Sequence, residues 1–135
     1  MTTHIRKPGV LVTGANGEMG HGLIERLAEE GDKNIIALDV RTIDDAMRPL
    51  CTAAIVGDIL EERLLERLQS EYEIHTIYHL AAVLSTRAEF TPEAAHRVNV
   101  DGTMHLMKLA IEQSRWHGRP VKFMFPSSIA AYGLP

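Results

Sequence analysis

The chain has 135 residues, enough for one domain with a hydrophobic core but too few for two. Its 45% hydrophobic and 24% charged residues are typical of globular proteins, and a net charge of -4 argues against nucleic acids and anionic membranes as partners. A single cysteine, no apolar stretch of membrane-spanning length and no apolar signal core near the N-terminus predict a reducing compartment, by default cytoplasmic.

Strands and helices are predicted to alternate along the chain. In order, the apolar patterns indicate a strand at 10–13, a helix at 17–30, a strand at 34–40, a weak strand at 53–56, a helix at 60–72, a strand at 74–80, a long helix at 92–116 and a strand at 121–126. Because the strands are apolar on both faces, they are expected to lie in a buried parallel sheet. We predict an α/β Rossmann fold, a doubly wound sheet of order 3-2-1-4-5, forming one domain over residues 1–135.

The first strand leads into a glycine-rich turn, from which the first helix begins. Such a helix N-terminus attracts a pyrophosphate, because its backbone N–H groups and its dipole favour anions. Gly14 is expected to permit the turn, Gly17 to admit the phosphates and Gly20 to allow close packing of helix on strand. The turn residues predicted to bind a dinucleotide are Gly14, Asn16, Gly17, Glu18, Met19 and Gly20, with the acidic Glu18 pointing outward.

An acidic residue follows at the end of the second strand. Asp39 lies about 20 residues after the glycines, where a carboxylate accepts hydrogen bonds from the adenosine ribose. It would repel a 2′-phosphate, which favours NAD over NADP, although Arg41 nearby is able to tolerate that phosphate. The plain structural alternative is an ordinary strand-to-helix turn with Asp39 on the surface.

The spacing of these glycines, with Thr13 before them, resembles the short-chain dehydrogenase/reductase superfamily. The closer resemblance is to its extended branch, the NAD-dependent epimerase/dehydratase family. Four further segments share it, namely 57–59 (Gly-Asp-Ile), 79–82 (His-Leu-Ala-Ala), 98–103 (Val-Asn-Val-Asp-Gly-Thr) and 126–133 (Pro-Ser-Ser-Ile-Ala-Ala-Tyr-Gly). The ordered set covers essentially the whole chain and is more specific than any one motif.

The resemblance implies roles for these segments. Asp58 would contact the adenine amino group and Ile59 its ring, while Asn99 would help to fix the loop after the fourth strand. Leu80, Ala81 and Ala82 would line the nicotinamide side. Ser128, with Ser127 as its neighbour, would be the catalytic serine that hydrogen-bonds the reacting substrate oxygen. Without the resemblance, two serines at a strand end indicate a turn or a helix cap.

The chain departs from this family in one respect. No Tyr-x-x-x-Lys pair is present, although the family uses it as the acid/base. We therefore expect the chain to be the N-terminal part of a longer enzyme, inactive or nearly so by itself. The alternative is a non-catalytic NAD-sensing module.

Two subfamilies remain open as the nearest relatives. Sugar-nucleotide epimerases and dehydratases share the glycine turn, Asn99 and the serine segment. Short-chain-type L-threonine 3-dehydrogenases share further details in residues 77–85 and at Glu89 and Pro92. The expected substrate is accordingly a nucleotide sugar or a small hydroxy compound.

The remaining residues of chemical interest give weaker indications. His75 and His79 are expected on one face of a strand, and no ligand set for a metal is apparent, so packing or surface roles are favoured. Met104 and Met107 on the long helix indicate core or interface positions, and a homodimer through that helix is a further expectation.

Overall fold

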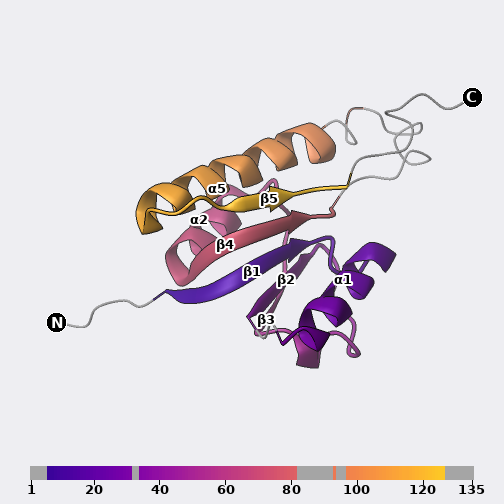
Figure 1. Ribbon diagram of the computed structural model, residues 1–135. Helices are drawn as coiled ribbons and strands as arrows, with labels where there is room; N and C mark the ends of the chain where they lie inside the picture. Colours follow the sequence, from indigo (N-terminus) through magenta and orange to yellow (C-terminus); the bar gives the residue numbers. More distant parts are fainter. Residues whose placement is uncertain (1–5, 32–33, 82–92, 94–96, 127–135) are drawn as a thin grey trace, which may run out of the picture.

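The structure, a computed structural model, describes residues 6–31, 34–81, 93 and 97–126. Its strands are β1 (Lys7–Thr13), β2 (Ile35–Asp39), β3 (Ala53–Val56), β4 (Tyr72–His79) and β5 (Lys122–Met124). Its helices are α1 (Glu18–Glu29), α2 (Glu62–Glu71) and α5 (Gly102–His117), with a 3-10 turn η1 (Arg48–Leu50) and a π turn η2 (Arg97–Asp101). All strand pairs are parallel in the order β3-β2-β1-β4-β5 (Figure 1), which confirms the predicted Rossmann topology.

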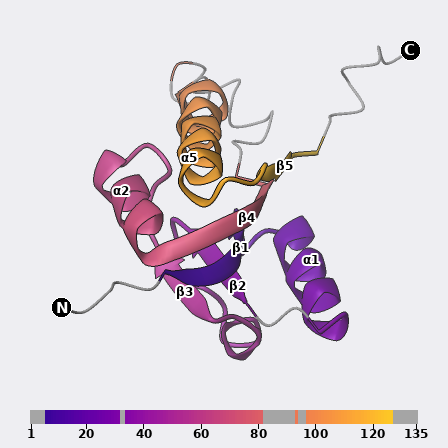
Figure 2. The same ribbon diagram turned by 60° about the vertical axis from the view of Figure 1, so that its left-hand side comes forward.

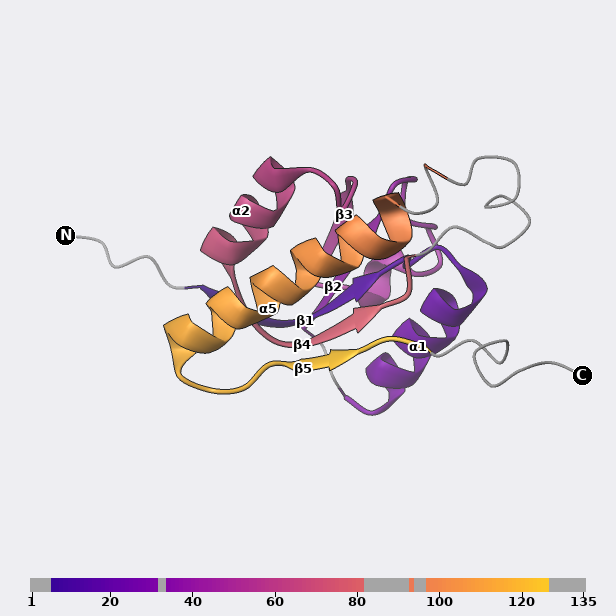
Figure 3. The same ribbon diagram turned by 90° about the horizontal axis from the view of Figure 1, so that it is seen from above.

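Helices cover the two faces of the sheet unequally. Helix α1 lies on one face, and α2 and α5 lie together on the other (Figure 2). Seen from above, α5 runs along β4 and β5 (Figure 3). Side chains alternate along β1, so that Leu11 enters the core beneath α2 and α5 while Val10 and Val12 enter the core beneath α1.

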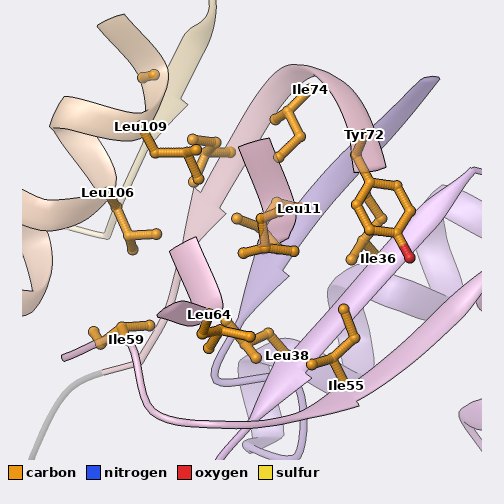
Figure 4. Close-up of a cluster of buried hydrophobic side chains, with 13 residues drawn as sticks. Leu11, Ile36, Leu38, Ile55, Ile59, Leu64, Tyr72, Ile74, Leu106 and Leu109 are labelled. Atoms are coloured by element: carbon orange, nitrogen blue, oxygen red, sulfur yellow. The ribbon is translucent and has the colours of Figure 1, made fainter. Parts of the chain in front are cut away.

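The core beneath α2 and α5 brings together side chains from every layer. Figure 4 shows Leu106 and Leu109 of α5 and Leu64 of α2 directed towards Leu11 of β1. Leu11 and Leu106 are fully buried. Burying a side chain of this size contributes about 1.5–3 kcal/mol. This apolar contact therefore fixes α5 on the sheet.

Strand β4 contains a bulge opposite β1. Gly9 pairs with Ile74 and Val10 pairs with Thr76, which leaves His75 without a partner in β1. The extra residue reverses the alternation of side chains, so that Ile74 and Ile77 both join the core beneath α2 and α5. The bulge falls at the first of the two histidines that were expected on one face of the strand, and they differ in burial, since His75 is exposed and His79 is buried.

Side chains of α5 hydrogen-bond to the backbone of the first part of β4, which has no partner in β5. Pairing of β4 with β5 starts at Thr76. Before that point, the Ile74 N–H donates to Gln113 Oε1 at 3.0 Å, and Gln113 Nε2 donates to the Tyr72 carbonyl at 2.9 Å. His117 Nε2 donates to the Ile74 carbonyl at 3.1 Å. The buried Gln113 thus replaces a neighbouring strand, because buried backbone groups need hydrogen-bond partners.

Some predicted elements differ from the observed ones. Tyr72, expected at the end of a helix, begins β4, and the described part of the long helix divides into η2 and α5. Strands β3 and β5 lie at the sheet edges and are not buried on both faces, as the exposure of Val56 and Met124 shows. Met104 and Met107 were expected to be core or interface residues, and their exposure rules out the core alternative. Within the described ranges, no helix is long and apolar enough to cross a membrane.

Candidate functional site

The glycine turn lies at the carboxyl edge of the sheet, between β1 and α1. Gly14 has the left-handed φ of +68°, and a Cβ atom on it would lie 2.7 Å from the Ala81 backbone nitrogen. A Cβ on Gly20 would lie 2.5 Å from the Gly14 carbonyl oxygen. These two positions therefore have the turn and the close approach that the sequence predicts, and a side chain is excluded from both.

The N-terminus of α1 has no side-chain cap. Gly17 occupies the N-cap position with an extended backbone, and no side chain hydrogen-bonds to this helix end in the described part of the chain. The first backbone N–H groups of a helix have no partner inside it, and the helix dipole adds partial positive charge there. Glu18 and Met19 are exposed, as expected for Glu18. This arrangement suits an anionic group bound by backbone N–H groups.

Asp39 is held beside the turn by the backbone. Its Oδ2 accepts from the Asn16 N–H at 2.9 Å, and its Oδ1 accepts from the Arg41 N–H at 3.0 Å. Each carboxylate oxygen can accept a second hydrogen bond. The carboxylate is therefore oriented by the chain and keeps one acceptor position on each oxygen.

Asn16 ties the glycine turn to the connection after β2. Its Nδ2 donates to the carbonyl oxygens of Arg41 at 3.3 Å and Thr42 at 2.7 Å, and its Oδ1 accepts from the Asp44 N–H at 3.0 Å. Its side chain thus fixes a loop as well as lying in the predicted binding turn. Asp44 also pairs with His21 of α1, with 2.9 Å between Oδ2 and Nε2.

The segment after β3 has a turn at Asp58 and a core residue at Ile59. Asp58 Oδ1 accepts from the Leu60 N–H at 2.9 Å, so one carboxylate oxygen shapes the turn. Ile59 is only 4% exposed and packs against Gly102, where a Cβ would meet its side chain. Ile59 is therefore first a packing residue, and little of its surface is left for a bound ring.

The end of β4 is fastened to the glycine turn. Thr13 Oγ1 accepts from the N–H groups of Leu80 at 3.1 Å and Ala81 at 3.2 Å, and it lies 2.7 Å from His79 Nδ1. The Leu80 N–H is shared with the Thr13 carbonyl at 3.1 Å. Leu80 and Ala81 are thus held next to Gly14, while Ala82 lies outside the described residues.

Asn99 reaches the same edge from η2. It is exposed, and its carbonyl oxygen accepts from Thr103 Oγ1 at 2.6 Å. Thr103 in turn lies 2.9 Å from His79 Nε2. The structure therefore connects η2 with the end of β4. Ser127 and Ser128, the predicted catalytic pair, lie outside the described residues.

An apolar hollow of about 260 Å³ opens beside the turn. It lies between the start of α1 and the ends of β4 and β5, and its lining is almost wholly apolar. The hollow brings Met19 and Leu80, two of the predicted cofactor residues, to one place. The other lining residues are Leu23, Tyr78, Met124, Phe125 and Pro126.

Other reactive side chains lie apart from this edge. Cys51 is half-buried, its Sγ donates to the Met47 carbonyl at 3.4 Å, and burial raises the pKa of the thiol, which disfavours the thiolate. No three histidine, cysteine or acidic side chains gather into a metal-binding group within the part of the chain that the structure describes.

Sequence reasoning named three polar residues of this edge but did not predict that they meet. Thr13, His79 and Thr103 form the connection between the turn, β4 and α5. A signal was present for Thr13, because this polar residue ends an apolar run just before the glycine turn. Thr103 entered only as the last residue of the segment 98–103, and its contact with His79 depends on how α5 packs.

Comparison with known proteins identifies the family to which the chain is similar. A family model described as the NAD dependent epimerase/dehydratase family matches residues 10–135. An uncharacterised epimerase/dehydratase of Staphylococcus aureus is 31% identical over 126 residues, which are 92% of this chain and 37% of that protein. The chain thus spans little more than a third of the curated relatives that it matches.

Solved structures of two kinds of enzyme are similar. A nucleoside-diphosphate-sugar epimerase from Agrobacterium tumefaciens has a TM-score of 0.79 and 27% identity, covering 100% of this chain and 42% of that one. A monomeric L-threonine 3-dehydrogenase from a metagenome has a TM-score of 0.76 and 35% identity, covering 90% and 36%. The similarity therefore extends to both subfamilies that the sequence left open.

Proposed function

Because the chain belongs to the NAD-dependent epimerase/dehydratase family, we propose that it is the NAD-binding portion of an enzyme that transfers hydride at a substrate hydroxyl or carbonyl. The observation that carries this proposal is the uncapped N-terminus of α1, behind the left-handed turn at Gly14 and next to the oriented carboxylate of Asp39. These are the features that bind a pyrophosphate and a ribose. Bound NAD would supply the hydride acceptor.

The residues at the edge divide among the parts of the dinucleotide. Backbone N–H groups at Gly17 to Gly20 would bind the pyrophosphate, and the free acceptor positions of Asp39 would bind the ribose hydroxyls. Asp58 and Ile59 would lie near the adenine. Leu80, Ala81 and Ala82 would lie on the nicotinamide side, and the apolar hollow beside Met19 and Leu80 supports that direction, since ligand rings favour apolar linings.

The substrate side rests on the resemblance alone. Ser128, with Ser127, would hydrogen-bond the reacting oxygen, and Asn99 would support the loop after β4. We favour a nucleotide sugar as the substrate and keep L-threonine as the alternative, since both kinds of enzyme are among the similar structures. A non-catalytic NAD-sensing module remains the third proposal. A Tyr-x-x-x-Lys pair encoded within a few tens of codons after Pro135 favours the enzyme.

Asp39 provides the test of cofactor binding. Replacing Asp39 by alanine is expected to weaken NAD binding by about tenfold or more, because hydrogen bonds to a charged acceptor contribute about 1.5–3 kcal/mol each. NADP binding should weaken less, because the substitution also removes repulsion of the 2′-phosphate. Isothermal titration calorimetry measures both, and Asp45→Ala, which removes a 97% exposed carboxylate from the same connection, is the control. Equal losses for NAD and NADP would refute Asp39 as the selector, and no NAD binding by the unaltered chain would refute the proposal itself.

We also propose that a second copy of the chain packs on the outer face of α5. Met104, Met107 and Ile111 of α5 and Val100 of the preceding η2 are each about half exposed and recur at the spacing of one helix face. An apolar stripe on a surface helix marks an interaction site. The opposite face of α5 is already occupied by the core.

A further inference from the structure

A continuous chain of hydrogen bonds joins four elements, β1, β4, α5 and η2, at the carboxyl edge of the sheet. Thr13 of β1 lies 2.7 Å from His79 Nδ1, His79 Nε2 lies 2.9 Å from Thr103 Oγ1, and Thr103 Oγ1 lies 2.6 Å from the Asn99 carbonyl oxygen. We name these three side chains the threonine–histidine chain. It spans from the glycine turn to the π turn, and the residues predicted to bind the cofactor flank both ends.

The partners fix the position of every proton in this chain. A carbonyl oxygen only accepts, so the single hydroxyl proton of Thr103 must point to Asn99. Thr103 Oγ1 is then the acceptor towards His79, and the imidazole must carry a proton on Nε2. In the neutral ring, Nδ1 is consequently the acceptor, and the Thr13 hydroxyl donates to it.

Thr13 has no unused hydrogen-bonding capacity in this arrangement. Its hydroxyl proton goes to His79, and its oxygen accepts from the N–H groups of Leu80 and Ala81. A hydroxyl has one donor and two acceptor positions, so all three are filled. The neutral imidazole is therefore what leaves the Thr13 oxygen free to hold both N–H groups beside Gly14.

The surroundings of His79 favour the neutral ring. His79 is 4% exposed, and the Phe123 ring of β5 lies against it at a centroid distance of 6.2 Å. Burial lowers the pKa of the imidazole. The charged residues of η2, Arg97 and Asp101, are exposed. The neighbouring His105 of α5 donates through Nδ1 to the Ile59 carbonyl, and no ion pair reaches His79 among the residues that the structure describes.

We propose that His79 is a positioning residue of the cofactor site, which is assembled only while this imidazole is neutral with its proton on Nε2. The proposal deepens the proposed function and rests on it for the identity of the ligand. A doubly protonated ring would direct an N–H at the Thr13 oxygen, which has no acceptor position left, and would leave the Thr13 proton without a partner. One of the bonds from Thr13 Oγ1 to Leu80 or Ala81 would then break, and the segment beside the turn would be held less firmly, although the Thr13 carbonyl would still accept from the Leu80 N–H.

The sign of the pH dependence follows from the lowered pKa. The unfolded chain takes up the proton near the ordinary imidazole pKa of about 6.5, before the folded chain does. The contribution of His79 to stability is therefore complete above about pH 6.5 and is lost as the pH falls from there through the folded pKa. Binding of NAD should weaken only as the folded chain itself takes up the proton, at the lowered pKa of His79, by about tenfold, which corresponds to one net hydrogen bond.

The first experiment reads the proton directly and needs no cofactor. In the 135-residue chain with 15N-labelled histidine, NMR at pH 7.5 should show His79 with a protonated Nε2 and an unprotonated Nδ1. The reverse tautomer, or a charged ring at this pH, would overturn the proposal. This result stands whether or not the protein binds NAD, so it is distinguishable from failure of the proposed function.

The second experiment measures unfolding midpoints and NAD affinity between pH 8 and pH 5. In the unaltered chain, the unfolding midpoint and the NAD affinity should both fall as the pH is lowered. In His79→Gln, whose side chain cannot titrate, both quantities should depend less on pH. His75→Gln, at an exposed position of the same strand, is the matched control and should keep the slope. Thr103→Val removes the acceptor for His79 Nε2 and should weaken NAD binding even at pH 8, and Thr103→Ser should restore it. An NAD affinity that is independent of pH, or a slope that His79→Gln leaves intact, would overturn the proposal while the proposed function stands.

Discussion

The two faces of the sheet are closed to different degrees. Among the residues that the structure describes, thirteen buried side chains form one core beneath α2 and α5, drawn from those helices, from every strand except β5 and from Ile59, whereas nine lie beneath α1. On the α1 face, the ends of β4 and β5 border an open apolar hollow, and Met124 and Phe125 are 52% and 63% exposed. More buried apolar side chains thus lie on the face covered by α2 and α5, and on the other face the hollow beside the start of α1 leaves room for a ligand.

Shortening a buried side chain in the core beneath α2 and α5 should give the largest loss in the free energy of unfolding. Leu106→Ala removes a fully buried side chain of α5 and should lower the free energy of unfolding by about 2–5 kcal/mol, through lost burial and the cavity left behind. Denaturant unfolding measures it. Lys108→Ala, at an exposed position of the same helix, should change stability by less than about 0.5 kcal/mol. Similar losses for both variants would contradict the view that α5 is held by its inner face.

The polar closure of β4 should contribute less than the apolar core. Gln113→Leu keeps the bulk but leaves the Ile74 N–H and the Tyr72 carbonyl without their side-chain partner, at a cost of about 1–3 kcal/mol. Hydrogen exchange at the Ile74 amide should accelerate together with the loss of stability. Glu112→Ala, next to it and exposed, is the control. A Gln113→Leu variant as stable as the unaltered chain would show that the edge of β4 does not need this closure.

The exposed apolar residues should affect stability least and association most. Met107→Glu should leave the free energy of unfolding within about 0.5 kcal/mol and reduce self-association in sedimentation velocity, because it places a charge in the outer stripe of α5. Phe125→Ser removes an exposed ring from the other face and tests whether that patch is the contact instead. Association that responds to Phe125→Ser and not to Met107→Glu would transfer the interface to the open face.

The topology was predictable because the pattern of apolar runs and helical repeats is unambiguous. The strand order and the conformation of Gly14 followed from the sequence, since a glycine turn between a strand and a helix has few alternatives. The placement of Asp39 beside the turn also followed, because parallel strands end at one edge of the sheet.

What the sequence did not reveal depends on packing between distant segments. The burial of Ile59 follows from the close approach of Gly102. The hydrogen bonds to the edge of β4 come from a glutamine of α5, which the helical pattern of the sequence would place among the exposed polar residues. The bulge at His75 has no local signature, because the residues on either side are ordinary strand formers. Such features are set by the fit of one layer on another, which no short window of sequence contains.

The bulge in β4 has a consequence for the whole carboxyl edge. Successive side chains of a strand point to opposite faces of the sheet. One surplus residue therefore moves every later side chain to the other face. With His75 skipped, His79 faces the same way as Thr13 and meets Thr103; without the skip, Tyr78 would occupy that side. A regular ladder that kept every residue would thus place Tyr78 opposite Thr13, whereas deleting His75 would remove the bulge and leave His79 in its place.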